Sequence, residues 1–291
     1  MTGDARLRLV VDNQAEAGLA VEHGFAAWIE AGGRRLLLDS GAGGALVANA
    51  AALGIDLAAA EAVVLSHGHY DHSGGLPQVL AVAADAVLYG APGIGRARFS
   101  CPPGRPPRAI GMAAEVRARI EALPPARRVE VREPLWLAPG IGLTGPIPRW
   151  SGEDAGGPFF LDPAAAEADP LDDDQALWLE TAAGVVIVVG CCHAGLINTV
   201  ERVRAVSGID RVAGIVGGFH LLNADEARLA DSVARLRAWA PDFVVPCHCS
   251  GAAAVARLGR DLGGTVVRPG RAGLALGLGR LCPAGAATAA G

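Results

Sequence analysis

Three of the chain's seven histidines fall within six residues, directly behind a short apolar run, in the stretch VVLSHGHYDHSGG at 63–75. A run of this length predicts a buried strand whose end opens into a loop. One histidine there could be a core residue bonded to a polar neighbour, but three imidazoles and a carboxylate in the order H-x-H-x-D-H would each need such a partner. Imidazole and carboxylate are ligands that zinc and similar cations take, so the stretch predicts a metal site.

Three of the other four histidines also follow apolar runs that are typical of buried strands. VVIVVGCCH ends at His193, VAGIVGGFH at His220 and DFVVPCH at His248. Strand ends along one edge of a layered α/β sheet are where sites assemble, so six of the seven histidines are expected to face one place. The seventh, His23, precedes the strand-like run GFAAWIE and is left open as a further member.

Strand-like and helix-like segments alternate along the 291 residues, of which 51% are apolar and 19% charged. This predicts one large globular α/β domain over 1–291. Whether that domain is built from two similar layered halves is left open. Strands are expected at 7–12, 25–30, 35–39, 61–65, 85–89, 128–131, 135–137, within IGLTGPIPRW at 141–150, and at 176–180, 185–189, 212–216 and 243–245, with TVVRPG at 265–270 closing the pattern. Helices are expected at 41–54, 73–84, 112–123, 198–206, 225–238 and 251–262.

Two irregular segments interrupt this alternation. Residues 90–128 are rich in Pro, Gly and Arg and are expected to form an inserted cap or loop, with one helix near its end. Residues 151–176 form a second, acidic loop. Arg96, Arg98, Arg105 and Arg108 of the cap could bind an anionic substrate, although a solvated loop is the simpler interpretation. Phe159 in the second loop could stack on a ring or simply pack.

Charge and residue usage exclude several functions. The net charge of −5 argues against a nucleic-acid partner held through its phosphates. All 25 basic residues are arginine, so the chain lacks the lysine of a P-loop and the Schiff-base lysine of pyridoxal enzymes. No apolar run reaches the roughly 20 residues that cross a bilayer, and the first residues are too polar for a signal peptide. We therefore expect a cytoplasmic protein with no membrane partner.

The six cysteines do not suggest a disulfide framework in a chain of this kind. Cys247 and Cys249 flank His248, and a strand-like backbone there would point both thiols away from the imidazole. A homodimer is left open, since exposed apolar cap surface would favour one.

The stretch SHGHYDHSGGL is similar to the signature of the metallo-β-lactamase superfamily. The resemblance implies an α/β fold, a four-layer αββα sandwich with a two-metal site at one edge of its sheets. LLLDSG at 36–41 resembles the superfamily's strand ending in Asp-Thr/Ser-Gly, which makes Asp39 an outer partner of the metals.

Further motifs between about residues 8 and 252 resemble one branch of that superfamily. They are VDN, EHGFAAWIE, LTGPIPR, DDQAL, GCCHAGLINTVE, GGFHL and PCHCSG. The branch includes the archaeal dihydropterin–ribofuranosylaminobenzene phosphate synthases and many uncharacterised metal-dependent hydrolases.

The chain departs from the superfamily's ligand pattern at two points. LTGPIPRW lacks the usual mid-chain histidine, for which His193 is the best substitute, and Cys191 stands where a bridging aspartate is usual. The resemblance then implies two divalent metal ions. Zinc is the first choice for their identity, and manganese or iron is also compatible. One is expected at His67, His69 and His193, and the other at Asp71, His72 and His248. Cys191 is left open as a thiolate bridge or a small buried residue.

A metal held by three protein ligands keeps open coordination positions for water. Binding to the metal lowers the pKa of that water from about 16 to about 7. We therefore expect a hydrolase that uses metal-bound hydroxide on a small ester, phosphoester or lactone substrate. Asp71 and His220 are its expected catalytic residues, His220 by holding the substrate or donating a proton. A role for His220 as a further metal ligand is left open. The branch resemblance leaves open a transferase that condenses a pterin alcohol diphosphate with an arylamine and releases pyrophosphate. A metal-containing binding or regulatory module is the third alternative.

Overall fold

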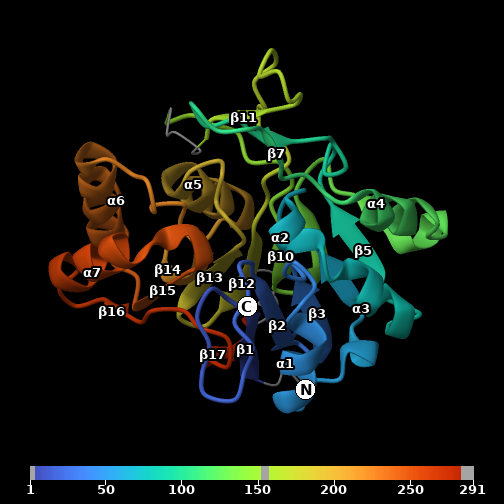
Figure 1. The fold of residues 1–291 in the computed structure, drawn as a ribbon. Helices are drawn as coiled ribbons and strands as arrows, with labels where there is room; N and C mark the ends of the chain where they lie inside the picture. The colour runs from blue at the N-terminus through green and yellow to red at the C-terminus, as the bar shows by residue number, and fades with distance from the viewer. Residues whose placement is uncertain (1–3, 152–156, 283–291) are drawn as a thin grey trace.

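The computed structural model describes residues 4–151 and 157–282. Two seven-stranded sheets lie face to face, with helices on the outer face of each (Figure 1). The first sheet has the order β17 (Ala275–Arg280), β1 (Asp4–Val11), β2 (Ala26–Ala31), β3 (Arg34–Leu38), β4 (Ala62–Val64), β5 (Val87–Gly90) and β8 (Arg128–Glu130). The second has the order β16 (Val266–Val267), β15 (Phe243–Cys247), β14 (Val212–Gly218), β13 (Gly184–Val189), β12 (Leu177–Thr181), β10 (Ile141–Leu143) and β9 (Leu135–Ala138).

Helices cover both outer faces, which gives the expected four-layer αββα sandwich. The first sheet is covered by α1 (Leu46–Ala52), α3 (Leu76–Val82) and α4 (Ala114–Glu121). The second is covered by α5 (Leu196–Ser207), α6 (Glu226–Trp239) and α7 (Ala252–Asp261). A one-turn helix, α2 (Tyr70–Ser73), and the 3-10 turns η1 (Leu57–Ala59), η2 (Pro125–Arg127) and η3 (His248–Ser250) complete the helical elements of the described residues.

Alternation of side chains along the strands builds the layers. In β3, Leu36 and Leu38 face the core between the two sheets, whereas Leu37 packs under the helices. In β13, Val186 joins the central core and Ile187 the outer one. Because successive side chains on a strand point to opposite faces, a continuous apolar run serves two cores at once. This is why inner strands such as β4 (AVV) and β13 (GVVIVV) read as unbroken apolar segments in the sequence.

The strands and helices predicted from the sequence are present within a few residues. Apart from the 3-10 turns and the two-residue strands of the small sheet described below, two elements were not predicted. β17 at 275–280, which pairs antiparallel with β1, was not predicted. Its sequence ALGLGR alternates buried Leu276 and Leu278 with exposed positions, but two glycines lower its strand propensity. The other omission is α2, because the stretch that holds Asp71 and His72 was predicted as open loop.

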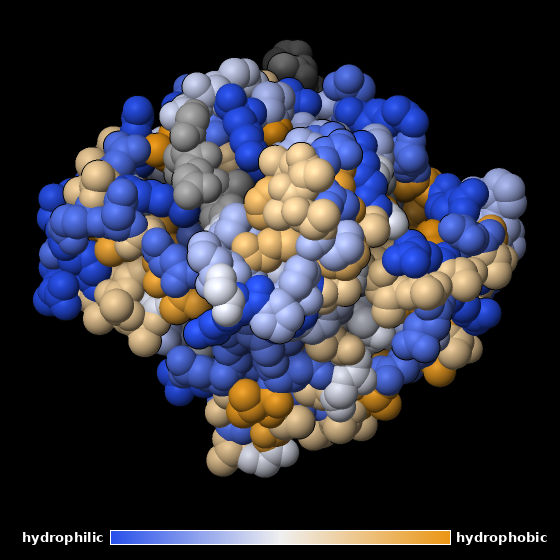
Figure 2. All heavy atoms as spheres, turned by 45° about the horizontal axis from the view of Figure 1, so that its top comes forward, coloured by the Kyte–Doolittle hydropathy of each residue, from blue (hydrophilic) through white to orange (hydrophobic). Residues whose placement is uncertain are grey.

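A small third sheet joins the two irregular segments above the site. Its strands are β11 (Phe159–Phe160), β6 (Phe99–Ser100) and β7 (Arg108–Ala109), in that order, so the cap at 90–128 pairs with the acidic loop. Residues 152–156 of that loop lie outside the described residues. Seen from this side, the described surface mixes hydrophilic and hydrophobic side chains (Figure 2). Among the described residues, none of the helices has the length and apolar character needed to span a membrane.

Candidate metal centre

The site lies where parallel strands of both sheets end. β3 pairs parallel with β4, and β13, β14 and β15 are parallel to one another. Asp39 follows β3, His67 follows β4, Cys191 follows β13, His220 follows β14 and His248 follows β15. The carboxyl ends of parallel strands meet at one edge of a sheet, so these residues converge although they are far apart in sequence. α2 adds Asp71 and His72 beneath the small sheet (Figure 1).

His67, His69 and His193 form one compact cluster. The Nε2 atom of His67 lies 3.0 Å from Nδ1 of His69, and Nε2 of His193 lies 3.2 Å from that same Nδ1. All three side chains are buried. The structure therefore brings together the three residues predicted to hold the first metal.

Hydrogen bonds and burial around this cluster leave some of its imidazole nitrogens without a proton. The Ser66 hydroxyl donates to Oδ2 of Asp39 at 2.6 Å, so its oxygen accepts the Nδ1 proton of His67 at 2.9 Å. Nε2 of His67 then carries a lone pair. Nδ1 of His69 faces two nitrogens but can bond at most one of them, and Nε2 of His69 is buried without a hydrogen-bond partner among the described residues. Burial holds the pKa of His67 well below its usual value and lowers that of His69 to about 3, so both rings are neutral.

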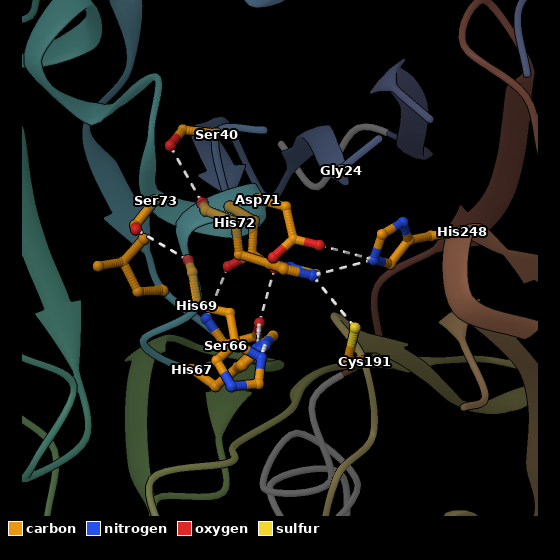
Figure 3. A network of polar contacts seen from close by, with 12 residues as sticks. Gly24, Ser40, Ser66, His67, His69, Asp71, His72, Ser73, Cys191 and His248 are labelled. Carbon is orange, nitrogen blue, oxygen red and sulfur yellow. Dashed lines mark hydrogen bonds and ion pairs between the residues drawn. The ribbon is translucent and has the colours of Figure 1, made fainter. Parts of the chain in front are cut away.

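The second predicted ligand set is gathered more loosely. Nε2 of His72 lies 3.3 Å from Nε2 of His248 and 3.1 Å from Sγ of Cys191 (Figure 3). Oδ2 of Asp71 lies 3.4 Å from Nε2 of His248. The compact groups at this end place His72 with His67 and Cys191, and His248 with Asp71 and His23.

The tautomers of the two histidines in the second set are also fixed, by hydrogen bonds at Nδ1 of each ring. Asp39 accepts the Nδ1 proton of His72 at 2.6 Å, and Oδ1 of Asn13 accepts the Nδ1 proton of His248 at 2.8 Å. In the neutral rings both Nε2 atoms therefore carry lone pairs, which face each other. Burial lowers the pKa of His248 to about 4, so that ring is neutral. Burial also acts to lower the pKa of His72, but Asp39 raises it to about 9, so without a cation His72 holds a second proton, on the Nε2 atom that faces His248. Converging lone pairs beside a carboxylate and a thiol fit a divalent cation, which would bind here in place of a proton.

Burial would raise the pKa of Asp71, but the hydrogen bond from His23 and the nearby charge of His72 hold it well below its usual value. The carboxylate is therefore ionised and available as an oxygen ligand.

The backbone around the site is strained at several strand ends. Asp39, Cys192, His220 and His248 all have φ between 45° and 58°, the left-handed region that side chains with a Cβ rarely adopt. Such residues cluster at functional sites because the surrounding structure holds them there. Gly190 has a different role: a Cβ there would lie 2.0 Å from Oγ of Ser66, so only glycine leaves room for that hydroxyl.

A cavity of about 300 Å³ opens onto the two clusters. His220 lines it, with its ring centroid 4.6 Å from that of His193 and 6.5 Å from that of Phe159. Phe159 also packs edge-on against His69 at 5.5 Å, so this residue of the acidic loop forms a wall of the cavity. Arg108 lies on the cavity lining too, 5.9 Å above the ring of Tyr70.

The other cap arginines have different roles. The buried Arg98 forms ion pairs with Asp169 at 2.9 Å and Asp173 at 2.8 Å, which ties the cap to the acidic loop. Arg96 pairs with Asp172 at the surface. Of the four arginines considered as anion-binding residues, these two are therefore engaged by the protein's own carboxylates.

The prediction that both cysteines beside His248 point away from it is wrong for Cys249. Residues 248–250 form the turn η3 instead of continuing the strand, so strict alternation ends at Cys247. Cys247 lies in the central core, whereas Cys249 lines the cavity in a compact group with Cys191 and His248.

Two orienting residues were missed in the sequence. Asn13 and Ser66 each bond an imidazole Nδ1. The signal was present, because Asn13 follows a strand in the motif VDN and Ser66 directly precedes the first histidine of its motif. A polar side chain at a strand end beside predicted ligands is a candidate for this role.

Comparison with known proteins gives consistent relatives. The model of the Metallo-beta-lactamase superfamily matches residues 19–248. The chain is 28% identical over 241 residues to the 7,8-dihydropterin-6-methyl-4-(beta-D-ribofuranosyl)-aminobenzene-5'-phosphate synthase of Methanocaldococcus jannaschii, covering 79% of this chain and 81% of that protein. It is 28% identical over 253 residues to the uncharacterized protein MJ0448 of the same organism, covering 87% and 93%. It is also similar in structure to Tm1679, a metal-dependent hydrolase of the beta-lactamase superfamily, with a TM-score of 0.79, 26% identity and coverage of 94% and 99%.

Proposed function

The chain belongs to the metallo-beta-lactamase superfamily, as its motifs predicted, and we propose that it is a metal-dependent hydrolase of small anionic esters, phosphoesters or lactones. The observation that carries the proposal is the convergence of imidazoles and a carboxylate on a cavity of about 300 Å³. Two divalent cations, zinc first, would bind there. His67, His69 and His193 would hold one of them, and Asp71, His72 and His248 the other.

The bound cations would supply Lewis acidity toward a carbonyl or phosphoryl oxygen and would activate water. The protein's own groups do the rest. Asp39 fixes the ring of His72 directly and that of His67 through Ser66. This keeps Nε2 of His72 aimed at His248 and Nε2 of His67 aimed at His69. His220 lines the cavity beside His193 and is placed to donate a proton to the leaving oxygen.

The cavity lining supports a small substrate with a planar part and a negative charge. Phe159 offers a ring edge against the histidines, and Arg108 is the arginine on the lining. A guanidinium suits a carboxylate or phosphate because it donates in a fixed fork. Hydrolysis would then occur at the histidine clusters while the charged group sits under the cap.

A transferase is the second candidate, and a specific observation favours it. The pterin-related synthase of Methanocaldococcus jannaschii matches over 81% of its length. In such a reaction the diphosphate of a pterin alcohol would leave as pyrophosphate when an arylamine takes its place, and no water would attack.

One pair of assays separates the two candidates. The protein, reconstituted separately with zinc, manganese and iron, is tested on phosphodiester and lactone substrates, and in parallel for pyrophosphate release from a pterin alcohol diphosphate with an arylamine. The hydrolase proposal predicts turnover in the first assay and its loss in His67→Ala. Pyrophosphate release alone, dependent on the arylamine, would favour the transferase. A metal-loaded protein inactive in both assays would favour a binding module.

A further inference from the structure

His23 lies at the mouth of the cavity, outside the six predicted ligands. Its side chain is 58% exposed, and its Nε2 atom lies 3.1 Å from Oδ2 of Asp71. Its ring centroid is 4.8 Å from that of His248. It is therefore a solvent-facing imidazole directed at a predicted ligand.

The backbone on both sides of His23 is held firmly. The carboxylate of Glu22 accepts backbone N–H groups from residues 42–45. On the other side, Gly24 passes so close to α2 that a Cβ there would lie 2.5 Å from the carbonyl oxygen of Asp71, and Phe25 donates its N–H to that oxygen at 3.2 Å. An exposed side chain between two such anchors has its Cα position fixed, which is what a binding residue needs.

The atoms around Asp71 have the composition of a cation's ligand shell. Its Oδ2 is approached by Nε2 of His23 at 3.1 Å and by Nε2 of His248 at 3.4 Å. Because Asn13 takes the Nδ1 proton of His248, Nε2 of the neutral ring brings a lone pair to the carboxylate, and the two do not form a hydrogen bond. One ligand atom from each of His23, Asp71 and His248 lies within 4.8 Å of the others. Two imidazoles and a carboxylate around one point suit zinc or cobalt(II).

We propose that His23 is a ligand of the outer cation, completing with Asp71 and His248 a site that faces the cavity mouth, alongside His72. The inference rests on the metal binding of the proposed function and is independent of the reaction. His23 would make the outer site accessible from solvent, whereas the cluster of His67, His69 and His193 is buried. The two cations would then differ in affinity, and His23 would affect only the outer one.

The test is a metal titration of the full chain after removal of metals with a chelator. Cobalt(II) absorption follows the ligand shell, elemental analysis gives the stoichiometry, and competition with a chromophoric chelator gives each zinc Kd. The wild type is expected to bind two cations. His23→Ala is expected to keep the tight cation and to weaken the other by at least about 10-fold, with an altered cobalt spectrum. His220→Ala, which changes a half-buried histidine of the cavity lining, is the matched control and is expected to keep both affinities.

His23→Gln separates a ligand from a positioning residue, because glutamine can still donate to Asp71 but is a poor ligand. Loss of the weaker cation in both His23 variants supports the proposal. Wild-type affinity for it in His23→Gln, an unchanged cobalt spectrum in His23→Ala, or binding of a single cation by the wild type would overturn it. Two tightly bound cations with no hydrolysis would instead count against the proposed function alone. Circular dichroism checks that each variant is folded.

Discussion

Replacement of Asp39 by asparagine tests the claim that hydrogen bonds from behind set the tautomers of the metal ligands. The buried carboxylate accepts three hydrogen bonds: from the backbone N–H of Ser66 at 2.7 Å, from the Ser66 hydroxyl at 2.6 Å and from Nδ1 of His72 at 2.6 Å. Asparagine has one acceptor oxygen, which the backbone N–H fixes on the Oδ1 side. Its amide N–H₂ then faces two donors.

The substitution disturbs one imidazole in each predicted ligand set. His72 can relieve the clash by giving up its Nδ1 proton and keeping a proton on Nε2, which leaves no lone pair on Nε2 for a cation. The Ser66 hydroxyl must turn, and His67 loses the oxygen that accepts its Nδ1 proton at 2.9 Å. Loss of such orienting bonds costs metal affinity about 10–100-fold, equivalent to about 1.4–2.7 kcal/mol. Because one carboxylate serves both rings, Asp39→Asn is expected to weaken both cations.

Zinc affinity is measured by competition with a chromophoric chelator, and urea unfolding of the metal-free protein gives the stability. Asp169→Asn is the matched control, because this carboxylate is also buried but pairs with Arg98 and touches no imidazole among its described contacts. It is expected to lose stability and keep zinc affinity. If Asp39→Asn binds both zinc ions within about twofold of the wild type, about 0.4 kcal/mol, then tautomer control by Asp39 is wrong.

Three further changes test other parts of the structure. Gly190→Ala places a Cβ 2.0 Å from a serine hydroxyl of the site and is expected to lower the free energy of urea unfolding by about 1–3 kcal/mol, whereas Gly277→Ala, with no neighbour within 4 Å, should change it little. Arg98→Met leaves two buried carboxylates without their cation and should cost about 3–5 kcal/mol, against less than about 1 kcal/mol for Arg96→Met at an exposed pair; equal losses in the two variants would contradict this. Arg108→Ala is expected to raise KM for an anionic substrate with kcat nearly unchanged, and an equal rise for a neutral analogue would rule out charge recognition.

The sequence indicated the layers because short apolar strands alternate with helical segments, and it indicated the site because histidines recur where those strands end. Both signals are local. What could not be predicted depends on turns and edges. β17 has a glycine-rich edge sequence that pattern alone does not distinguish from loop, and Cys249 faces the cavity because His248 adopts a left-handed backbone with φ of 45°. A single residue in that conformation ends the strand alternation on which the prediction relied.

The interactions of Asp39 explain why separate motifs form one centre. It follows β3 in a left-handed conformation, which turns its side chain across the edge of the sheet toward β4 and α2. There it contacts His72 directly and reaches His67 through Ser66, so one carboxylate orients a ring from each of the two predicted ligand sets. The free energy needed to strain this backbone and to bury the charge comes from folding of the rest of the protein, before any cation binds. A change that preserves the six predicted ligands but disturbs Asp39 should therefore impair both cations together, whereas a change at the exposed His23 should impair one.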